Sequence, residues 1–205
     1  MSAGHRAGRG AGHRAGPSAG HRAGRGAGHR AGPSASDGAA HTATVTNVVL
    51  AGLGGQGVIK ASDILADAAL RAGLDVKKSE VHGMSQRGGS VTSDVRFGTA
   101  VLSPMVPFGE ADYLVVLGSS EVEVTRPLLR PGGVLFAPDL IPDADLPNKR
   151  SLNVALLGAL SYHLELPVEA MLEAVKAALP AKLHAVNDAA FELGRKLAAA
   201  QGTIR

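Results

Sequence analysis

After residue 43 the apolar positions of the chain follow two different periods. Residues 44–52, TVTNVVLAG, are a β-branched run that ends in glycine, which is the pattern of a strand buried on both faces. Residues 56–71 instead repeat their apolar positions at helical spacing. Val58, Ala61, Ile64, Leu65 and Ala68 form one face of this helix, and Lys60, Asp63, Asp67 and Arg71 form the opposite one. The pattern therefore predicts a strand, a glycine-rich loop and an amphipathic helix, in that order.

Similar patterns continue toward the C-terminus. Further extended segments are predicted at 75–83, 90–98, 100–106, 112–118 and 132–138. A helix is predicted to start in SSEVEVTRPLL, where Pro127 interrupts it. The last third reads as helices at 152–164, 168–179 and 183–200. Strands that alternate with helices are typical of an α/β fold, so we expect a three-layer, Rossmann-like sheet with flanking helices and a helical C-terminal third.

Composition divides the chain at about residue 40. Residues 3–18, AGHRAGRGAGHRAGPS, recur unchanged at 19–34, and such a stretch buries too little apolar surface to offset the entropy lost on ordering. We therefore predict a disordered Ala/Gly/His/Arg tail over 1–40 and one folded domain over 41–205. The tail holds six Arg and one Asp, so the basic net charge of +3 resides there; the rest has 15 Lys and Arg against 17 Asp and Glu.

The repeat itself admits three interpretations. Its arginines suit a weak tether to nucleic acid or to an acidic surface. Its histidines, which are His5, His13, His21 and His29, suit a metal-binding tract. Because the signal is only compositional, we favour a duplicated tail that has no role in the chemistry.

The chain contains no cysteine. It can therefore form no disulfide, use no thiol nucleophile and supply no thiolate to an iron–sulfur cluster. The longest uncharged run, residues 38–59, holds too many glycine and polar residues for a membrane helix. We expect a soluble, cytoplasmic protein with no membrane and no nucleic-acid partner.

The first glycine cluster, GLGGQG, fits the pattern G-x-G-x-x-G at Gly52, Gly54 and Gly57. Glycines at these positions allow a tight turn and let a phosphate approach the backbone at the start of a helix. A dinucleotide-binding domain would next place an acid at the end of the second strand, and Glu80 lies at a suitable distance along the chain. The alternative is that the glycines serve only the packing of strand against helix.

A second polar loop, EVHGMSQRGGSV, follows where that fold would begin another helix. Gly83, Gly88 and Gly89 permit unusual turns, and the loop shows no apolar periodicity. His82 and Gln86 offer directional hydrogen bonds, and Arg87 offers a cationic fork for a phosphate or carboxylate. Two loops at neighbouring strand ends predict one polar crevice, although a purely structural role for them stays open. A metal site is not predicted, because His82 and Glu80 lack a third nearby ligand.

Both glycine loops, together with SPMVPFGEADYLVVLGSSEVEVTRPLLRPGG, NVALLGAL and NDAAFELG, carry a resemblance to a known family. Over about residues 46–198 the chain resembles the gamma-type subunit of the 2-oxoacid:ferredoxin oxidoreductases, in particular the indolepyruvate type. The pairing of GLGGQG with EVHGMSQRGGSV is specific to that resemblance.

The resemblance implies an accessory subunit of a complex that oxidatively decarboxylates an aryl 2-oxo acid, such as indolepyruvate, to its acyl-CoA while ferredoxin is reduced. Thiamine diphosphate, Mg and iron–sulfur clusters are then expected in an alpha subunit, CoA is a co-substrate, and this chain alone binds no cofactor. The implied active-site loops consist of Gly52, Gly54, Gly55, Gln56 and Gly57 in the first, and Glu80, His82, Gly83, Met84, Gln86, Arg87, Gly88 and Gly89 in the second. No residue is assigned a proton-transfer role.

Two other functions remain open at this point. One is a self-sufficient NAD(P)-dependent oxidoreductase, in which Lys77 and Lys78 would favour a 2′-phosphate. The other is a non-enzymatic module for nucleotide sensing or assembly.

Overall fold

A five-stranded sheet organises the domain in the computed structural model, which describes residues 44–83 and 88–201. Its central strand is β1 (Val45–Leu53), within the order β2-β3-β1-β4-β5. The other strands are β2 (Asp75–His82), β3 (Ser90–Gly98), β4 (Ala111–Val116) and β5 (Leu129–Phe136). The helices are α1 (Val58–Arg71), α2 (Val122–Thr125), α3 (Leu152–Ser161), α4 (Val168–Ala178) and α5 (His184–Gln201). The predicted α/β class and helical C-terminal third are confirmed.

Strand directions make this a mixed sheet. β4 runs parallel to β1 and β5 runs parallel to β4, as alternation of strands with helices predicts. β3 is antiparallel to both of its neighbours, β1 and β2. The hairpin of β2 and β3 therefore returns β3 to the edge of β1 and leaves β2 as an outer strand. This order decides where the residues of the second loop lie relative to the first.

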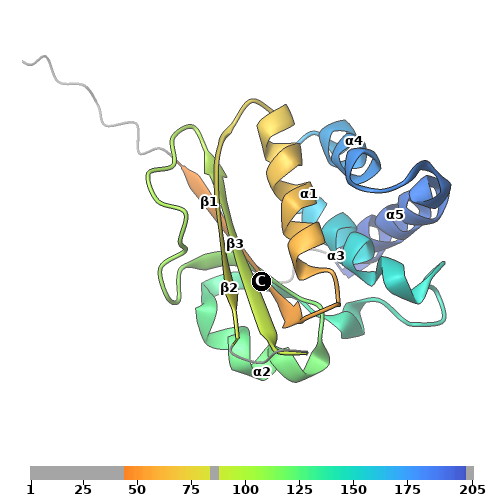
Figure 1. Ribbon diagram of the computed structural model, residues 1–205, viewed down its shortest axis with the longest axis horizontal. Coiled ribbons are helices and arrows are strands. Elements are labelled where there is room, and N and C mark those ends of the chain that lie inside the picture. The colour runs from red at the N-terminus through yellow and green to blue at the C-terminus, as the bar shows by residue number, and fades with distance from the viewer. Residues whose placement is uncertain (1–43, 84–87, 202–205) are drawn as a thin grey trace, which may run out of the picture. The chain divides into compact units, whose positions relative to one another are not determined.

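One face of the sheet carries the main core. Helices α1, α3, α4 and α5 lie on this side (Figure 1). Val48 and Leu50 of β1 point into it and are fully buried, together with Ile64 and Leu65 of α1. The apolar stripe that the sequence predicts along α1 is thus the stripe that packs on the sheet.

A thinner layer covers the opposite face. The alternate residues of β1, Val49 and Ala51, join Leu114 and Val116 of β4 in a second apolar cluster. Partly buried residues from the segment after β3 and from α2 pack against it, namely Val106 and Val122. Because strand side chains alternate between faces, the continuous apolar run in β1 serves both layers, and the predicted three-layer arrangement is confirmed.

Helices α3 and α5 cross with their backbones in contact. A Cβ built on Gly158 would collide with the carbonyl oxygen of Phe191, and one built on Gly194 would collide with that of Ala155. Both glycines are therefore needed for packing rather than for an unusual backbone conformation.

The prediction of an extended segment at 100–106 is wrong. These residues form an irregular connection between β3 and β4. Its backbone groups are bound by side chains of the sheet rather than by a neighbouring strand, as with Val106 N–H, which donates to the Asp94 carboxylate at 3.0 Å. Pro104 also has no N–H to give to a ladder.

Other predicted elements match the structure closely. The helix predicted to start after β4 is α2, a single turn with 3₁₀ turns on both sides, and Pro127 lies in the second of these. The tail over 1–40 lies outside the described residues. Among the described helices, none has the length and apolar character needed to cross a membrane.

Candidate functional site

The first glycine loop turns β1 into α1. Gly55 and Gly57 have φ values of 94° and 88°, which side chains rarely tolerate. Gly57 is the N-cap of α1, and a Cβ there would also lie 2.7 Å from Nδ2 of Asn153. That buried amide donates a long hydrogen bond, 3.4 Å, to the Gly57 carbonyl. The conformation of the loop thus depends on glycine at two positions and on a side chain from α3.

The side chain of Gln56 stabilises the loop through contacts with the end of β1. Its Oε1 accepts the N–H of Leu53 at 2.7 Å. A Cβ built on Gly52 or on Gly118 would lie 2.8 Å from this oxygen. The side chain of Gln56 is therefore wedged between the end of β1 and the segment after β4, where it stabilises the turn.

The two glycine loops are joined directly. Gly54 N–H of the first loop donates to the carbonyl of Gly89 in the second at 2.9 Å. Within the second loop, Gly83 N–H donates to the carbonyl of Ser90 at 2.7 Å. The structure thus brings Gly54, Gly83, Gly88 and Gly89 to one end of the sheet, where β1 and β2 finish and β3 begins. Met84, Gln86 and Arg87 lie outside the described residues.

A pocket of about 320 Å³ lies where the loops meet the start of α1. Its lining is Leu53, Gly54, Gly55, Gly57, Val58, Ile59, Lys60, His82 and Val91. The first helical turn here has no acidic residue, and no described side chain caps it. Ala61 N–H donates to the Gly57 carbonyl, which begins the hydrogen-bonded part of the helix. Among the described residues, the N–H groups of the first turn before Ala61 have no backbone acceptor, and N–H groups at a helix start, together with the Lys60 ammonium, favour an anion.

Glu80 does not reach this pocket. It lies in β2, which β3 separates from β1, and it pairs with Lys78 at 2.6 Å. Burial lowers the pKa of Lys78, but hydrogen bonds to Asp63 and Glu80 outweigh it and raise the pKa above its usual value. Lys77 pairs with Asp75 at 2.8 Å. The arrangement needed for a ribose and a 2′-phosphate, with an acid on the strand next to β1, is thus not the one observed.

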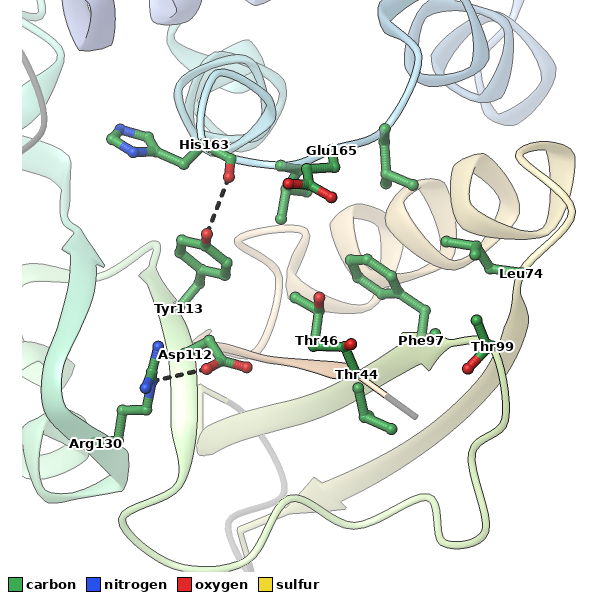
Figure 2. A pocket seen from close by; sticks show the side chains of 14 residues that line it. Thr44, Thr46, Leu74, Phe97, Thr99, Asp112, Tyr113, Arg130, His163 and Glu165 are labelled. Carbon is green, nitrogen blue, oxygen red and sulfur yellow. Dashed lines mark hydrogen bonds and ion pairs between the residues drawn. The ribbon is translucent and has the colours of Figure 1, made fainter. Parts of the chain in front are cut away.

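A larger cavity, of about 640 Å³, lies at the other end of the sheet, where β1 begins and β3 ends (Figure 2). Asp112 and Arg130 form an ion pair of 2.7 Å at its side, and Tyr113 donates a hydrogen bond of 3.0 Å to the His163 carbonyl. Burial raises the pKa of the Tyr113 hydroxyl and lowers that of the His163 imidazole. None of the predicted site residues that the structure describes lines this cavity, and its Asp112 and Arg130 side chains are paired with each other. The glycine-loop pocket is the better candidate site.

Comparison with known proteins shows the family to which this fold belongs. Residues 47–150 match the family model of pyruvate ferredoxin/flavodoxin oxidoreductase. The indolepyruvate oxidoreductase subunit IorB of Thermococcus kodakarensis is 38% identical over 194 residues, which span 74% of this chain and 95% of the relative. The chain belongs to the pyruvate ferredoxin/flavodoxin oxidoreductase family. It is a subunit of a 2-oxoacid:ferredoxin oxidoreductase.

Other family members support the assignment of fold and subunit type. The common gamma subunit of the pyruvate/ketoisovalerate oxidoreductases of Thermococcus litoralis is 33% identical, across 73% of this chain and 89% of the relative. The crystal structure of a keto/oxoacid ferredoxin oxidoreductase gamma subunit from Geobacter sulfurreducens has a TM-score of 0.65 and 27% identity, and covers 76% of this chain and 99% of its own. The resemblance seen in the sequence is confirmed at the level of the family.

The sequence analysis did not assign three residues, Lys60, Gly118 and Asn153, to the glycine-loop site of this chain. Lys60 was noticed only as part of the polar face of α1, yet it lines the pocket. Asn153 and Gly118 contact the first loop from α3 and from the segment after β4. Both residues stand in segments that carry the family resemblance, NVALLGAL and DYLVVLGSS, but their contacts with the first loop are made across the fold and could not be read from those segments.

Proposed function

We propose that the chain is the gamma-type subunit of an indolepyruvate-type 2-oxoacid:ferredoxin oxidoreductase. The reaction converts an aryl 2-oxo acid and CoA into the acyl-CoA and CO₂, and the two electrons released reduce ferredoxin. The support for the aryl substrate is the name shared by relatives that are 38% and 36% identical to this chain. Thiamine diphosphate with its Mg²⁺ and the iron–sulfur clusters belong to the alpha subunit in this proposal, since this chain has no cysteine to hold a cluster.

In this proposal the glycine-loop pocket binds the phosphates of CoA at the edge of the active site. One observation carries this role: α1 starts at the pocket with no capping side chain from the described residues and no acidic residue in its first turn, and Lys60 stands in that turn. Helix N-termini and lysines both favour phosphate oxygens. His82 lines the same pocket and is a further hydrogen-bond partner, with no proton-transfer step assigned to it.

The role of the loops is to position CoA. A thioester forms only if the CoA thiol is held against the acyl group on the partner subunit, and binding the remote phosphates supplies that orientation. Gly54 and Gly55 lack side chains, so they let the diphosphate approach the backbone closely.

Lys60→Gln in the reconstituted complex tests this role. The loss of an exposed charged contact to phosphate is worth about 1 kcal/mol, so KM for CoA should rise about fivefold while KM for the 2-oxo acid stays within twofold. Lys182→Gln is the matched control, because it removes the same charge from an exposed position at the 3₁₀ turn before α5. An unchanged KM for CoA in Lys60→Gln would remove the basis for CoA binding at this pocket.

The subunit role has its own test. The purified chain should be colourless and inactive with any 2-oxo acid, and turnover of indolepyruvate with CoA should appear only when the alpha subunit is added. Turnover by the chain alone would contradict the proposal. Calorimetric titration of the chain with NADH and NADPH separates it from the dinucleotide-binding alternative, which requires measurable binding.

A further inference from the structure

The segment between β3 and β4 exposes an unusual amount of apolar surface. Residues 99–109, TAVLSPMVPFG, include no charged side chain, although 19% of the chain is charged. Leu102, Met105 and Phe108 are 99%, 59% and 76% exposed. The segment lies on the side of the sheet opposite α1 and the C-terminal helices (Figure 1).

Polar side chains of β3 fix the backbone of this segment. Arg96 reaches across from β3 and donates from Nη1 to the carbonyls of Ser103 and Met105, at 3.0 Å each. Asp94, two residues earlier on the same face, accepts the N–H of Val106 at 3.0 Å. These charge-assisted bonds hold the backbone on both sides of Met105.

Two further contacts anchor the segment from within. Val101 is only 2% exposed, and its N–H donates to the Asp75 carboxylate of β2 at 2.8 Å. Val106 packs on the second apolar cluster. The exposed side chains are therefore presented by a backbone that is fixed before any partner binds, which lowers the entropy lost on binding.

The apolar surface continues along β2 toward the glycine loops. Ser79 hydrogen-bonds to the Pro104 carbonyl at 3.5 Å, so Ser79 faces the segment. Val81 is two residues further along β2, hence on the same face, and is 55% exposed. Its neighbour His82 points to the opposite face and lines the pocket. The surface thus adjoins the candidate site across one edge strand.

We propose that the apolar surface formed by Val81, Leu102, Met105 and Phe108 is where the thiamine diphosphate-bearing subunit docks. The inference rests on the proposed function. Interface centres lack charge and are rich in Met and aromatic residues, and exposed apolar patches of this kind mark sites of association.

The occupant follows from where the surface lies and from the size of the relatives. The acyl group that reacts with CoA is on the thiamine subunit, so that subunit must reach the edge of the sheet at His82, next to Val81. The IorB relative is covered over 95% of its length and the gamma subunit of known structure over 99%, so this domain makes up nearly all of each. The face that joins them to their enzymes must then lie on the domain itself.

Leu102→Asp and Phe108→Glu, made singly, test the proposal. Each side chain is largely exposed, so the melting temperature of the full-length chain should stay within about 2 °C of the unmodified value. Affinity for the immobilised thiamine subunit should fall at least tenfold, as expected for central interface residues. Leu70→Asp is the matched control: Leu70 is 58% exposed on α1, on the other side of the sheet, and its replacement should change affinity less than twofold.

Each outcome has a distinct meaning. If the unmodified chain binds the thiamine subunit tightly and both variants keep that affinity, the proposed docking surface is wrong and the proposed function is unaffected. An unmodified chain that does not bind the thiamine subunit at all refutes the proposed function and this proposal with it. If light scattering shows a dimer of the chain alone that Leu102→Asp dissociates, a second copy covers the surface and the proposal is wrong.

Discussion

The amide oxygen of Gln56 occupies the space that a side chain at Gly118 would need, since a Cβ there would lie 2.8 Å away. The same oxygen accepts the N–H of Leu53 at 2.7 Å. A residue of the first glycine loop is thereby fitted against the segment that follows β4. The conformation of the candidate site therefore depends on contacts between elements that are distant in sequence.

This relationship predicts coupling between the two positions. Gln56→Ala should destabilise the fold by about 0.5–1.5 kcal/mol through the lost hydrogen bond. Gly118→Ala should also destabilise the fold, because the new methyl group crowds the Gln56 amide. Backbone strain does not contribute, since the backbone of Gly118 is extended, with φ of −121°, and accepts alanine. In the double variant the crowding is relieved. Its loss of unfolding free energy, measured by denaturant unfolding, should therefore be smaller than the sum of the two single losses by at least about 0.5 kcal/mol.

Gly52→Ala provides the control for this coupling. A Cβ there would also lie 3.0 Å from Val58 Cγ2 and 3.1 Å from Leu117 Cβ. Removing the Gln56 side chain leaves those contacts in place, so Gly52→Ala should remain destabilising in the Gln56→Ala background. Equal rescue of both glycine variants would contradict a specific contact between Gln56 and Gly118.

The crossing of α3 and α5 predicts a larger effect. Gly194→Ala would push a methyl group into the Ala155 carbonyl, and only separation of the helices can relieve this collision. The unfolding free energy should fall by at least about 3 kcal/mol. Gly132→Ala is the comparison, since it has positive φ but no neighbour within 4 Å, and backbone strain alone is worth about 1–2 kcal/mol. Thermal unfolding of both variants measures the difference, and equal effects would show that the helices adapt.

The lowered pKa of His163 predicts a specific pH dependence of stability. Its folded-state pKa is below the usual 6.5, because burial disfavours the charged imidazole. Above pH 6.5 the group is neutral in both states and has no effect. As the pH falls below 6.5 the unfolded chain takes up the proton more readily, so stability is lost down to the folded-state pKa.

His163→Phe isolates this contribution. The imidazole packs edge-on against the Phe136 ring, with ring centroids 5.4 Å apart, and phenylalanine can keep that contact. The variant should lose less stability than the unmodified chain when urea unfolding is compared at pH 7 and pH 5. An identical loss in both proteins would show that His163 does not contribute.

Much of the fold could be predicted because local pattern and tertiary packing agree. In β1 and α1 the apolar positions that set the period are the residues that pack on each other, such as Leu50 and Ile64. The prediction failed at 100–106, where the segment AVLSPMV was read as extended. The backbone carbonyls of this segment accept hydrogen bonds from the Arg96 side chain of β3 instead of pairing with a strand. A local sequence pattern does not indicate such a contact.

The candidate site was predictable in its glycine loops but not in its surroundings. Glycine spacing identified Gly52, where a Cβ would collide, and Gly57, where φ is positive, because these needs for a missing side chain arise within the turn itself. The spacing did not single out Gly55, which also has a positive φ. The position of Glu80 was not predictable, since a sequence does not reveal that β3 enters the sheet between β2 and β1. The contact of Asn153 with Gly57, 96 residues away, was equally unpredictable, although Asn153 begins the segment NVALLGAL.

The final prediction concerns the repeat over 1–40. The IorB relative of Thermococcus kodakarensis aligns over 95% of its own length but only 74% of this chain, and the family model begins at residue 47, so the family match does not include residues 1–40. The repeat also lacks an apolar face with which to dock. Deletion of residues 1–40 should therefore leave both the affinity for the thiamine subunit and kcat/KM for the 2-oxo acid within about twofold. A truncated chain that no longer assembles would instead identify the repeat as an interaction arm, and restoring one copy of the 16-residue unit would then show whether its arginines are sufficient for assembly.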